Sequence, residues 1–164
     1  MTKVEFLKVF GNWNSHLMLL WASLEATKHL KLPTLELGSG MGSTAVLRQY
    51  CKDEGLEFIT YDDKMEYAKE NDSIYIENWD TLPLRKDYGV VLVDHAPGED
   101  RKIRLPLLHH AQIIIAHDTE PAAEHGYQMR PEINKYKYHL DFETPGAWAT
   151  AMSDHIDVTK LLES

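Results

Sequence analysis

Two short runs of acidic and histidine residues are the side chains of this sequence best suited to chemistry. Asp94-His95 follows the apolar run 89–93, and His117-Asp118 follows the mainly apolar run 111–116. Because burying an unpaired charge is costly, charged groups at the ends of buried strands need solvent, partners or a function. A histidine with a pKa near neutrality suits a general base, and the carboxylates of Asp94 and Asp118 suit a hard cation such as Mg²⁺. Structural hydrogen bonds among these groups are the alternative, and a transition metal is another.

A glycine-rich segment, residues 36–44, offers a second place for a ligand. It reads Glu-Leu-Gly-Ser-Gly-Met-Gly-Ser-Thr and joins a predicted strand directly to a predicted helix. Glycines let the backbone turn tightly and approach a ligand closely, and the N–H groups at a helix N-terminus attract an anionic group. Asp62 ends the next predicted strand, where a carboxylate can accept hydrogen bonds from both ribose hydroxyls of a nucleoside cofactor. The alternative is that the glycines only make a turn and Asp62 only caps a helix.

Alternating strands and helices must position these residues. The pattern predicts strands at 34–37, 56–61, 73–77, 89–94, 111–116, 136–142 and 148–152. It predicts a first helix capped by Asn12, Asn14 or Ser15 and ended by Pro33, helices at 44–51, 63–70 and 99–108, and a loop or short helix at 121–129. Such alternation indicates a mainly parallel α/β sheet, and the last two strands pair antiparallel because no helix fits between them. Ligands of these sheets bind where the strands end.

Length and composition limit the classes of protein to consider. The 164 residues form one predicted domain, 1–164, with a helical N-terminal segment at 1–32. A net charge of −9 disfavours nucleic acid and anionic membranes as partners, because both require a basic face. A single cysteine, Cys51, allows neither an internal disulfide nor a cysteine-based zinc site. The first residues lack the apolar core of a signal peptide, and no apolar stretch approaches the length of a spanning helix, so we expect a cytoplasmic protein.

The spacing of the glycines points to one family of nucleoside-binding folds. Gly38, Gly40 and Gly42 alternate with other residues and Glu36 lies two residues ahead, unlike the Gly-x-Gly-x-x-Gly of dinucleotide folds. With Asp62 after the second strand, this pattern resembles the class I S-adenosylmethionine (SAM)-dependent methyltransferases, over about residues 35–152. The resemblance implies a three-layer, doubly wound, mostly parallel sheet of seven strands with the last strand antiparallel, a Rossmann-like fold. It also implies SAM as the cofactor.

The same resemblance implies roles for the residues near the loop. Gly38, Ser39 and Gly40 would line the methionine part of SAM, Glu36 would orient the loop or reach the amino group, and Asp62 would hold the ribose. Asn78, Trp79 and Asp80, after the third strand, would lie near adenine, although Trp79 fits a core position equally well. The rest of the predicted cofactor-binding loop is Gly42, Ser43 and Thr44. The segment 12–16, Asn-Trp-Asn-Ser-His, is unusual for a plain loop and could close over a cofactor.

The two strand ends resemble those of metal-assisted small-molecule O-methyltransferases, the sugar and catechol types. Asp94 and Asp118 match the two aspartates of that pattern, but Thr119 stands where an asparagine is usual, and Glu120 would have to replace it. The prediction is SAM-dependent methylation of a small-molecule hydroxyl, in which His95, His117 or a metal ion at Asp94 and Asp118 assists deprotonation. Arg101 fits a solvated helix face better than an anion clamp. The acceptor is expected to be a small molecule, and a homo-oligomer is compatible with the sequence.

Two other functions share part of this pattern. An NAD-dependent oxidoreductase would use the same kind of loop and Asp62, but the glycine spacing differs and no Tyr-x-x-x-Lys pair with a supporting serine is recognisable. A non-catalytic SAM-binding protein of the same fold would bind the cofactor without turnover.

Overall fold

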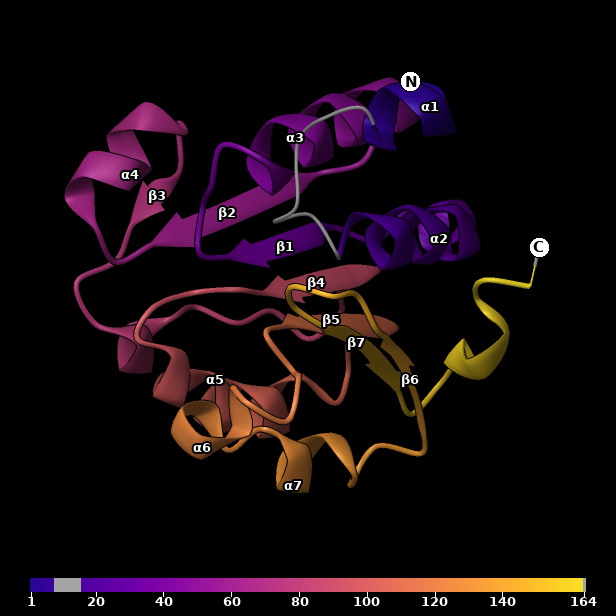
Figure 1. Cartoon of the computed structure of the whole chain (residues 1–164). Coiled ribbons are helices and arrows are strands. Elements are labelled where there is room, and N and C mark those ends of the chain that lie inside the picture. The colour runs from indigo at the N-terminus through magenta and orange to yellow at the C-terminus, as the bar shows by residue number, and fades with distance from the viewer. Residues whose placement is uncertain (8–15, 164) are drawn as a thin grey trace.

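The computed structural model describes residues 1–7 and 16–163, and its centre is a seven-stranded sheet (Figure 1). The strands are β1 (Thr34–Leu37), β2 (Phe58–Asp62), β3 (Ile74–Tyr75), β4 (Val90–Val93), β5 (Ile113–His117), β6 (Tyr138–Phe142) and β7 (Ala149–Ser153). Their order is β3-β2-β1-β4-β5-β7-β6. Neighbours from β3 to β5 pair parallel, whereas β7 pairs antiparallel with both β5 and β6. The predicted mostly parallel sheet with an antiparallel final strand is therefore confirmed.

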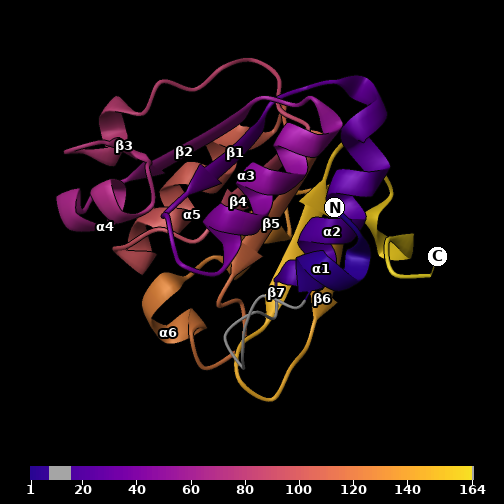
Figure 2. The same ribbon diagram turned by 90° about the horizontal axis from the view of Figure 1, so that it is seen from above.

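Helices cover both faces of the sheet and make it the middle of three layers. The helices are α1 (Lys3–Leu7), α2 (Leu17–Thr27), α3 (Ser43–Glu54), α4 (Met65–Glu70), α5 (Arg101–Arg104), α6 (Glu124–Tyr127) and α7 (Arg130–Ile133). Short 3₁₀ helices are η1 (Lys28–Leu30), η2 (Trp79–Thr81), η3 (Gly98–Asp100), η4 (Leu105–Leu108) and η5 (Val158–Lys160). Helices α1 to α3 lie over one face and α5 to α7 over the other (Figures 1 and 2). None of the helices in the described residues is long and apolar enough to cross a membrane.

Two expectations about helices change in the structure. The single helix expected at 99–108 is divided into η3, α5 and η4, and Pro106 lies at the start of η4, where its missing N–H breaks the α-helical ladder. The segment expected at 121–129 contains α6, and α7 follows it. The proposed caps Asn12, Asn14 and Ser15 lie outside the described residues.

The central strands are buried on both faces, which explains their apolar sequences. All four residues of β4 and all five of β5 are buried. Because successive side chains point to opposite faces, Val91 and Val93 pack in one core cluster with η4 and α7, and Val90 and Leu92 pack in another with α2 and α3. This alternation continues past the strand ends and decides where the functional side chains point.

The loop after β1 lies directly against the end of β4. Gly38 has a φ of +90°, and its N–H donates to the carbonyl of Tyr61 at 2.9 Å. A Cβ at this position would lie 2.5 Å from the backbone oxygen of Asp94 and 2.6 Å from the Cα of His95. The loop can follow this path only because residue 38 has no side chain.

A buried carboxylate fastens the other side of the same loop. Glu36, in β1, is fully buried and accepts hydrogen bonds from Ser43 Oγ at 2.5 Å, Thr44 Oγ1 at 2.8 Å and Thr60 Oγ1 at 2.7 Å. Thr44 Oγ1 in turn accepts from the N–H of Gly40 at 2.8 Å. Burial raises the pKa of Glu36 to about 7, although the hydroxyl donors act in the opposite direction. Glu36 therefore ties the start of α3 and the glycine loop to the sheet.

We expect Gly38→Ala to destabilise the fold far more than Gly55→Ala. Both glycines have positive φ, but a Cβ at Gly55 would meet nothing within 4 Å. The backbone strain alone should lower the free energy of unfolding by about 1 kcal/mol at Gly55, and the clash with the end of β4 should add at least about 2 kcal/mol at Gly38. Urea denaturation of both variants measures the difference. Equal losses would contradict the close approach of the loop to β4.

We expect the stability of the wild type relative to Glu36→Gln to fall as pH rises from about 4.5 to about 7. The folded-state pKa of Glu36 lies above its ordinary value of 4.5, so the stabilisation is complete below that value and is lost as pH rises through about 7. The change in the difference between the two unfolding free energies should be roughly 1–3 kcal/mol. Urea denaturation across this pH range measures it, and a difference that does not vary with pH would contradict a buried, protonatable Glu36.

Candidate active site

Two hollows meet at the carboxyl end of β4. The first has a volume of about 90 Å³, and the second has a volume of about 320 Å³. The first is lined by Gly38, Ser39, Asp62, Asp63, Lys64, Tyr67, Asp94 and Ala96. The second is lined by His16, Gly40, Gly42, Ser43, Asp94, His117 and Asp118. Asp94 borders both, so the structure brings the glycine loop, the end of β2 and the ends of β4 and β5 to one place.

Asp62 holds the glycine loop against the end of β2. Its Oδ2 accepts from the N–H of Ser39 at 2.8 Å and from Ser39 Oγ at 3.0 Å, and its Oδ1 accepts from the N–H of Lys64 at 2.8 Å. Only 3% of Asp62 is exposed, whereas Asp63 is half-buried and lines the same hollow. Burial raises the pKa of Asp63. Three lining residues, Asp63, Lys64 and Tyr67, were not expected from the sequence. The pair of adjacent aspartates at 62 and 63 is the signal that could have indicated the first of them.

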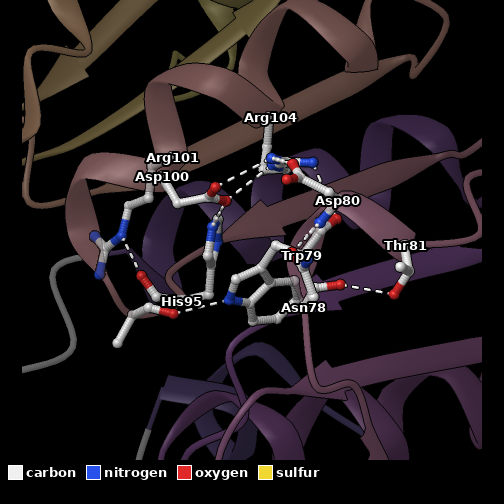
Figure 3. A network of polar contacts seen from close by, with 9 residues as sticks. Asn78, Trp79, Asp80, Thr81, His95, Asp100, Arg101 and Arg104 are labelled. Atoms are coloured by element: carbon white, nitrogen blue, oxygen red, sulfur yellow. Dashed lines mark hydrogen bonds and ion pairs between the residues drawn. The ribbon is translucent and has the colours of Figure 1, made fainter.

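Trp79 and His95 are buried side by side (Figure 3). Trp79 is 5% exposed and donates from Nε1 to the carbonyl of Ala96 at 2.8 Å, and its ring lies 4.4 Å from that of His95. His95 is fully buried, and its Nε2 lies 2.8 Å from Asp100 Oδ2. Burial lowers the pKa of His95 to about 4. Neither residue lines either hollow, so the structure separates His95 from the other candidate catalytic residues and favours the core interpretation of Trp79.

The other two residues expected near adenine also lie in this network (Figure 3). Asn78 caps η2 by accepting from the N–H of Asp80 at 2.9 Å, and Asp80 pairs with Arg104 at 2.6 Å. Arg104 also contacts Asp100 at 2.8 Å. Asn78 and Asp80 therefore fix η2 against α5 and line neither hollow.

A buried guanidinium lies between the ends of β4 and β5. Arg101 contacts Asp94 Oδ1 at 3.2 Å and Asp118 Oδ2 at 3.1 Å, and it donates to the carbonyls of His95 at 2.8 Å and His117 at 3.0 Å. It is only 5% exposed, so the expectation of a solvated helix face is wrong. Because this cation already bridges the two carboxylates, the arrangement does not fit a Mg²⁺ ion held by Asp94 and Asp118.

Two residues after Asp118 bear on that metal site: Thr119, which stands in place of the usual asparagine, and Glu120, which would have to replace it. Both have other contacts. The hydroxyl of Thr119 lies 2.7 Å from that of Thr150, and Glu120 accepts from the N–H of Trp148 at 3.0 Å.

Asp94 and His117 lie side by side because of strand register and side-chain alternation. Val93 of β4 pairs with Ala116 of β5, so Asp94 and His117 are the next residues along the two strands. His117 Nδ1 lies 3.2 Å from Asp94 Oδ1. Burial lowers the pKa of His117, but the contact with Asp94 outweighs it and leaves the pKa raised. Burial acts to raise the pKa of Asp94, but the contacts with His117 and Arg101 together outweigh burial and leave this pKa lowered.

Backbone geometry brings Asp118 to the same hollow. Asp118 follows His117 directly and would point to the opposite face if the chain stayed extended. Its φ of +56° turns the backbone, and its Oδ1 lies 3.5 Å from His117 Nδ1. The two carboxylates therefore flank the His117 imidazole.

His16 is a site residue that the sequence analysis did not identify. It precedes α2, is 4% exposed and lies with its ring 4.7 Å from the ring of His117, nearly edge-on. Among residues 1–7 and 16–163, neither ring nitrogen finds a hydrogen-bond partner. Burial lowers the pKa of His16 to about 4, so the imidazole is neutral at physiological pH. The unusual segment 12–16 was its only sequence signal, and the remainder of that segment lies outside the described residues.

Comparison with known proteins finds similarity in structure and not in sequence. No family model and no curated protein matches the chain. A suspected O-methyltransferase from Klebsiella pneumoniae superposes with a TM-score of 0.63 at 14% identity, over 88% of this chain and 81% of that one. The human methyltransferase 10 domain containing protein gives 0.55 at 14% identity, over 90% and 84%. A 16S rRNA methyltransferase from T. thermophilus, in complex with AdoMet and guanosine, gives 0.53 at 12% identity, over 87% and 43%.

These similarities agree with the strand order and with the position of the glycine loop between β1 and α3. The chain has the fold of the class I SAM-dependent methyltransferases.

Proposed function

We propose that the chain is a SAM-dependent methyltransferase that acts on a hydroxyl group of a small molecule. The observation that carries the proposal is the meeting of two hollows at Asp94: the glycine loop borders both, the end of β2 borders the smaller, and the Asp94–His117 pair borders the larger. The larger hollow, about 320 Å³, has the volume of a small-molecule site. A cofactor lying along the glycine loop from the first hollow into the second, and an acceptor in the rest of the second, would therefore meet beside a carboxylate and an imidazole.

The loop and the end of β2 have groups that suit SAM. Position 40 has open space around it, so the backbone there can approach a ligand closely. Helix α3 starts at Ser43 and directs its first N–H groups toward the loop, where they suit the carboxylate of the methionine part. Asp62 and Asp63, at the rim of the first hollow, suit the ribose hydroxyls. When bound, SAM supplies an electrophilic methyl group on its sulfonium.

The Asp94–His117 pair suits the removal of the acceptor proton. Asp94 orients the imidazole through Nδ1, and its negative charge stabilises the protonated ring. Arg101 and the backbone carbonyls that it contacts hold Asp94 and Asp118 in place, so the pair is preorganised. His117 would take the proton while the acceptor oxygen attacks.

The lining of the larger hollow favours an acceptor without phosphate groups. It contains Asp94, Asp118 and two histidines but no lysine or arginine among the described residues, and Arg101 is already paired with both carboxylates. The net charge of −9 acts in the same direction. Some structural neighbours act on RNA, so a structured RNA belongs among the acceptors to be tested.

We expect SAM and S-adenosylhomocysteine to bind the wild type with a 1:1 stoichiometry, and NAD not to bind. Gly40→Val should weaken both affinities by at least about tenfold, because the side chain would fill the space beside the loop without disturbing the fold. Gly126→Val is the matched control, since a Cβ there also meets nothing within 4 Å but lies in α6. Isothermal titration calorimetry measures all three. Binding of NAD alone would favour the oxidoreductase, and undiminished affinity in Gly40→Val would contradict the loop assignment.

We expect Asp94→Asn to lower turnover by about 10²-fold or more while SAM affinity changes only a few-fold, because the amide keeps the shape but cannot stabilise the protonated His117. Release of S-adenosylhomocysteine, followed with catechols, sugars and a structured RNA, measures turnover. Asp154→Asn is the control, since Asp154 also pairs with a histidine, His109, away from both hollows. Unchanged turnover in Asp94→Asn would contradict the catalytic role. Binding of SAM by the wild type with no turnover of any acceptor would indicate a non-catalytic SAM-binding protein.

A further inference from the structure

Three side chains in the larger hollow gather as the ligands of a metal ion do. His16, Asp94 and His117 each offer one ligand atom, and these atoms all lie within 4.8 Å of one another. They come from three separate elements: the start of α2, the end of β4 and the end of β5. His117 Nδ1 and Asp94 Oδ1 are already 3.2 Å apart, close to the separation of roughly 3.4 Å for two donors of a tetrahedral site with bonds of about 2.0–2.1 Å.

His16 is the observation that distinguishes this cluster from an ordinary ion pair. It is 4% exposed, lines the hollow, and has no hydrogen-bond partner at either ring nitrogen within the part of the chain that the structure describes. Buried polar groups are almost always paired, because leaving one unpaired costs free energy. The described residues give His16 no such partner, and its ring packs against that of His117. A ligand in the hollow would supply the missing interaction.

We propose that His16, Asp94 and His117 bind one transition-metal ion of the zinc, cobalt or ferrous class. Two imidazoles and one carboxylate match the ligand preferences of these ions, whereas Mg²⁺ and Ca²⁺ prefer oxygen ligands throughout. This set differs from the Asp94–Asp118 pair that the sequence predicts, and it does not require Arg101 to move away from Asp118. The remaining coordination positions would face the hollow.

The charges around the cluster suit a cation. Asp94 and Asp118 contribute two negative charges and Arg101 one positive charge, which leaves one net negative charge beside the two imidazoles. Asp94 Oδ1 also contacts Arg101 at 3.2 Å, and a carboxylate has enough lone pairs to bind an ion and accept this hydrogen bond at the same time. Hydrogen bonds from outer residues, such as this one from Arg101 to the Asp94 carboxylate, commonly orient metal ligands.

The site can be tested on the whole chain without any acceptor or SAM. After treatment with a chelator, the protein is titrated with Zn²⁺ by calorimetry and with Co²⁺ by visible absorption, which reports the coordination geometry of cobalt. We expect one ion per chain. His16→Ala, His117→Ala and Asp94→Asn should each weaken binding by at least about tenfold. His29→Ala and His139→Ala are the matched controls, because both histidines are exposed, and they should leave the affinity unchanged.

A second variant separates loss of a ligand from loss of the fold. His16→Leu removes a buried unpartnered polar group, so its thermal stability without metal should equal or exceed that of the wild type. Zn²⁺ should raise the Tm of the wild type but not that of His16→Leu, since only an ion bound to the folded state stabilises it.

Three results would overturn the site: no ion bound by the wild type, wild-type affinity in the His16 variants, or loss of binding in the His29 or His139 controls. Because SAM binding is measured separately, failure of the metal site would leave the proposed methyltransferase function intact.

Discussion

The guanidinium of Arg101 is the interaction on which the rest of the site depends. Two carboxylates, Asp94 and Asp118, lie at the ends of adjacent strands beside buried histidines, and without a cation between them they would repel each other in a poorly hydrated place. Arg101 contacts both, and it also satisfies the carbonyls of His95 and His117. The ends of β4 and β5 are thereby fixed, so the groups around them keep a defined geometry.

The glycine loop is fixed by two complementary constraints. On one side, Gly38 lies so close to the end of β4 that no side chain fits. On the other, the buried Glu36 holds Ser43 and Thr44, and Asp62 holds Ser39. Several residues expected to touch a cofactor therefore shape the loop that would receive it. The surfaces left for the cofactor itself are the loop backbone, the open space at Gly40 and the rim of the first hollow.

The N-terminal part of the chain contributes to the site from outside the strand ends. His16 lies at the start of α2, a helix that packs on β4, β5 and β7, and its ring reaches that of His117. The fold by itself does not require a histidine there, whereas a ligand in the larger hollow would give its unpartnered nitrogens a role. The methyl-transfer and metal-binding proposals share Asp94 and His117, but binding of SAM and binding of a metal ion are separate measurements, so each proposal can fail without the other.

Sequence alone was sufficient to predict the succession of strands and helices along the chain, because local patterns determine it. The β-branched runs of β4 and β5 indicate strands covered on both faces, and the glycines place a turn between β1 and α3. Side-chain alternation, combined with the register of β4 and β5, would also have placed the side chain of His95 on the other face of the sheet from those of Asp94 and His117. The turn at Asp118, the burial of Arg101 and the approach of His16 were not predictable in this way. They depend on packing between segments far apart in the sequence, which only the tertiary structure decides.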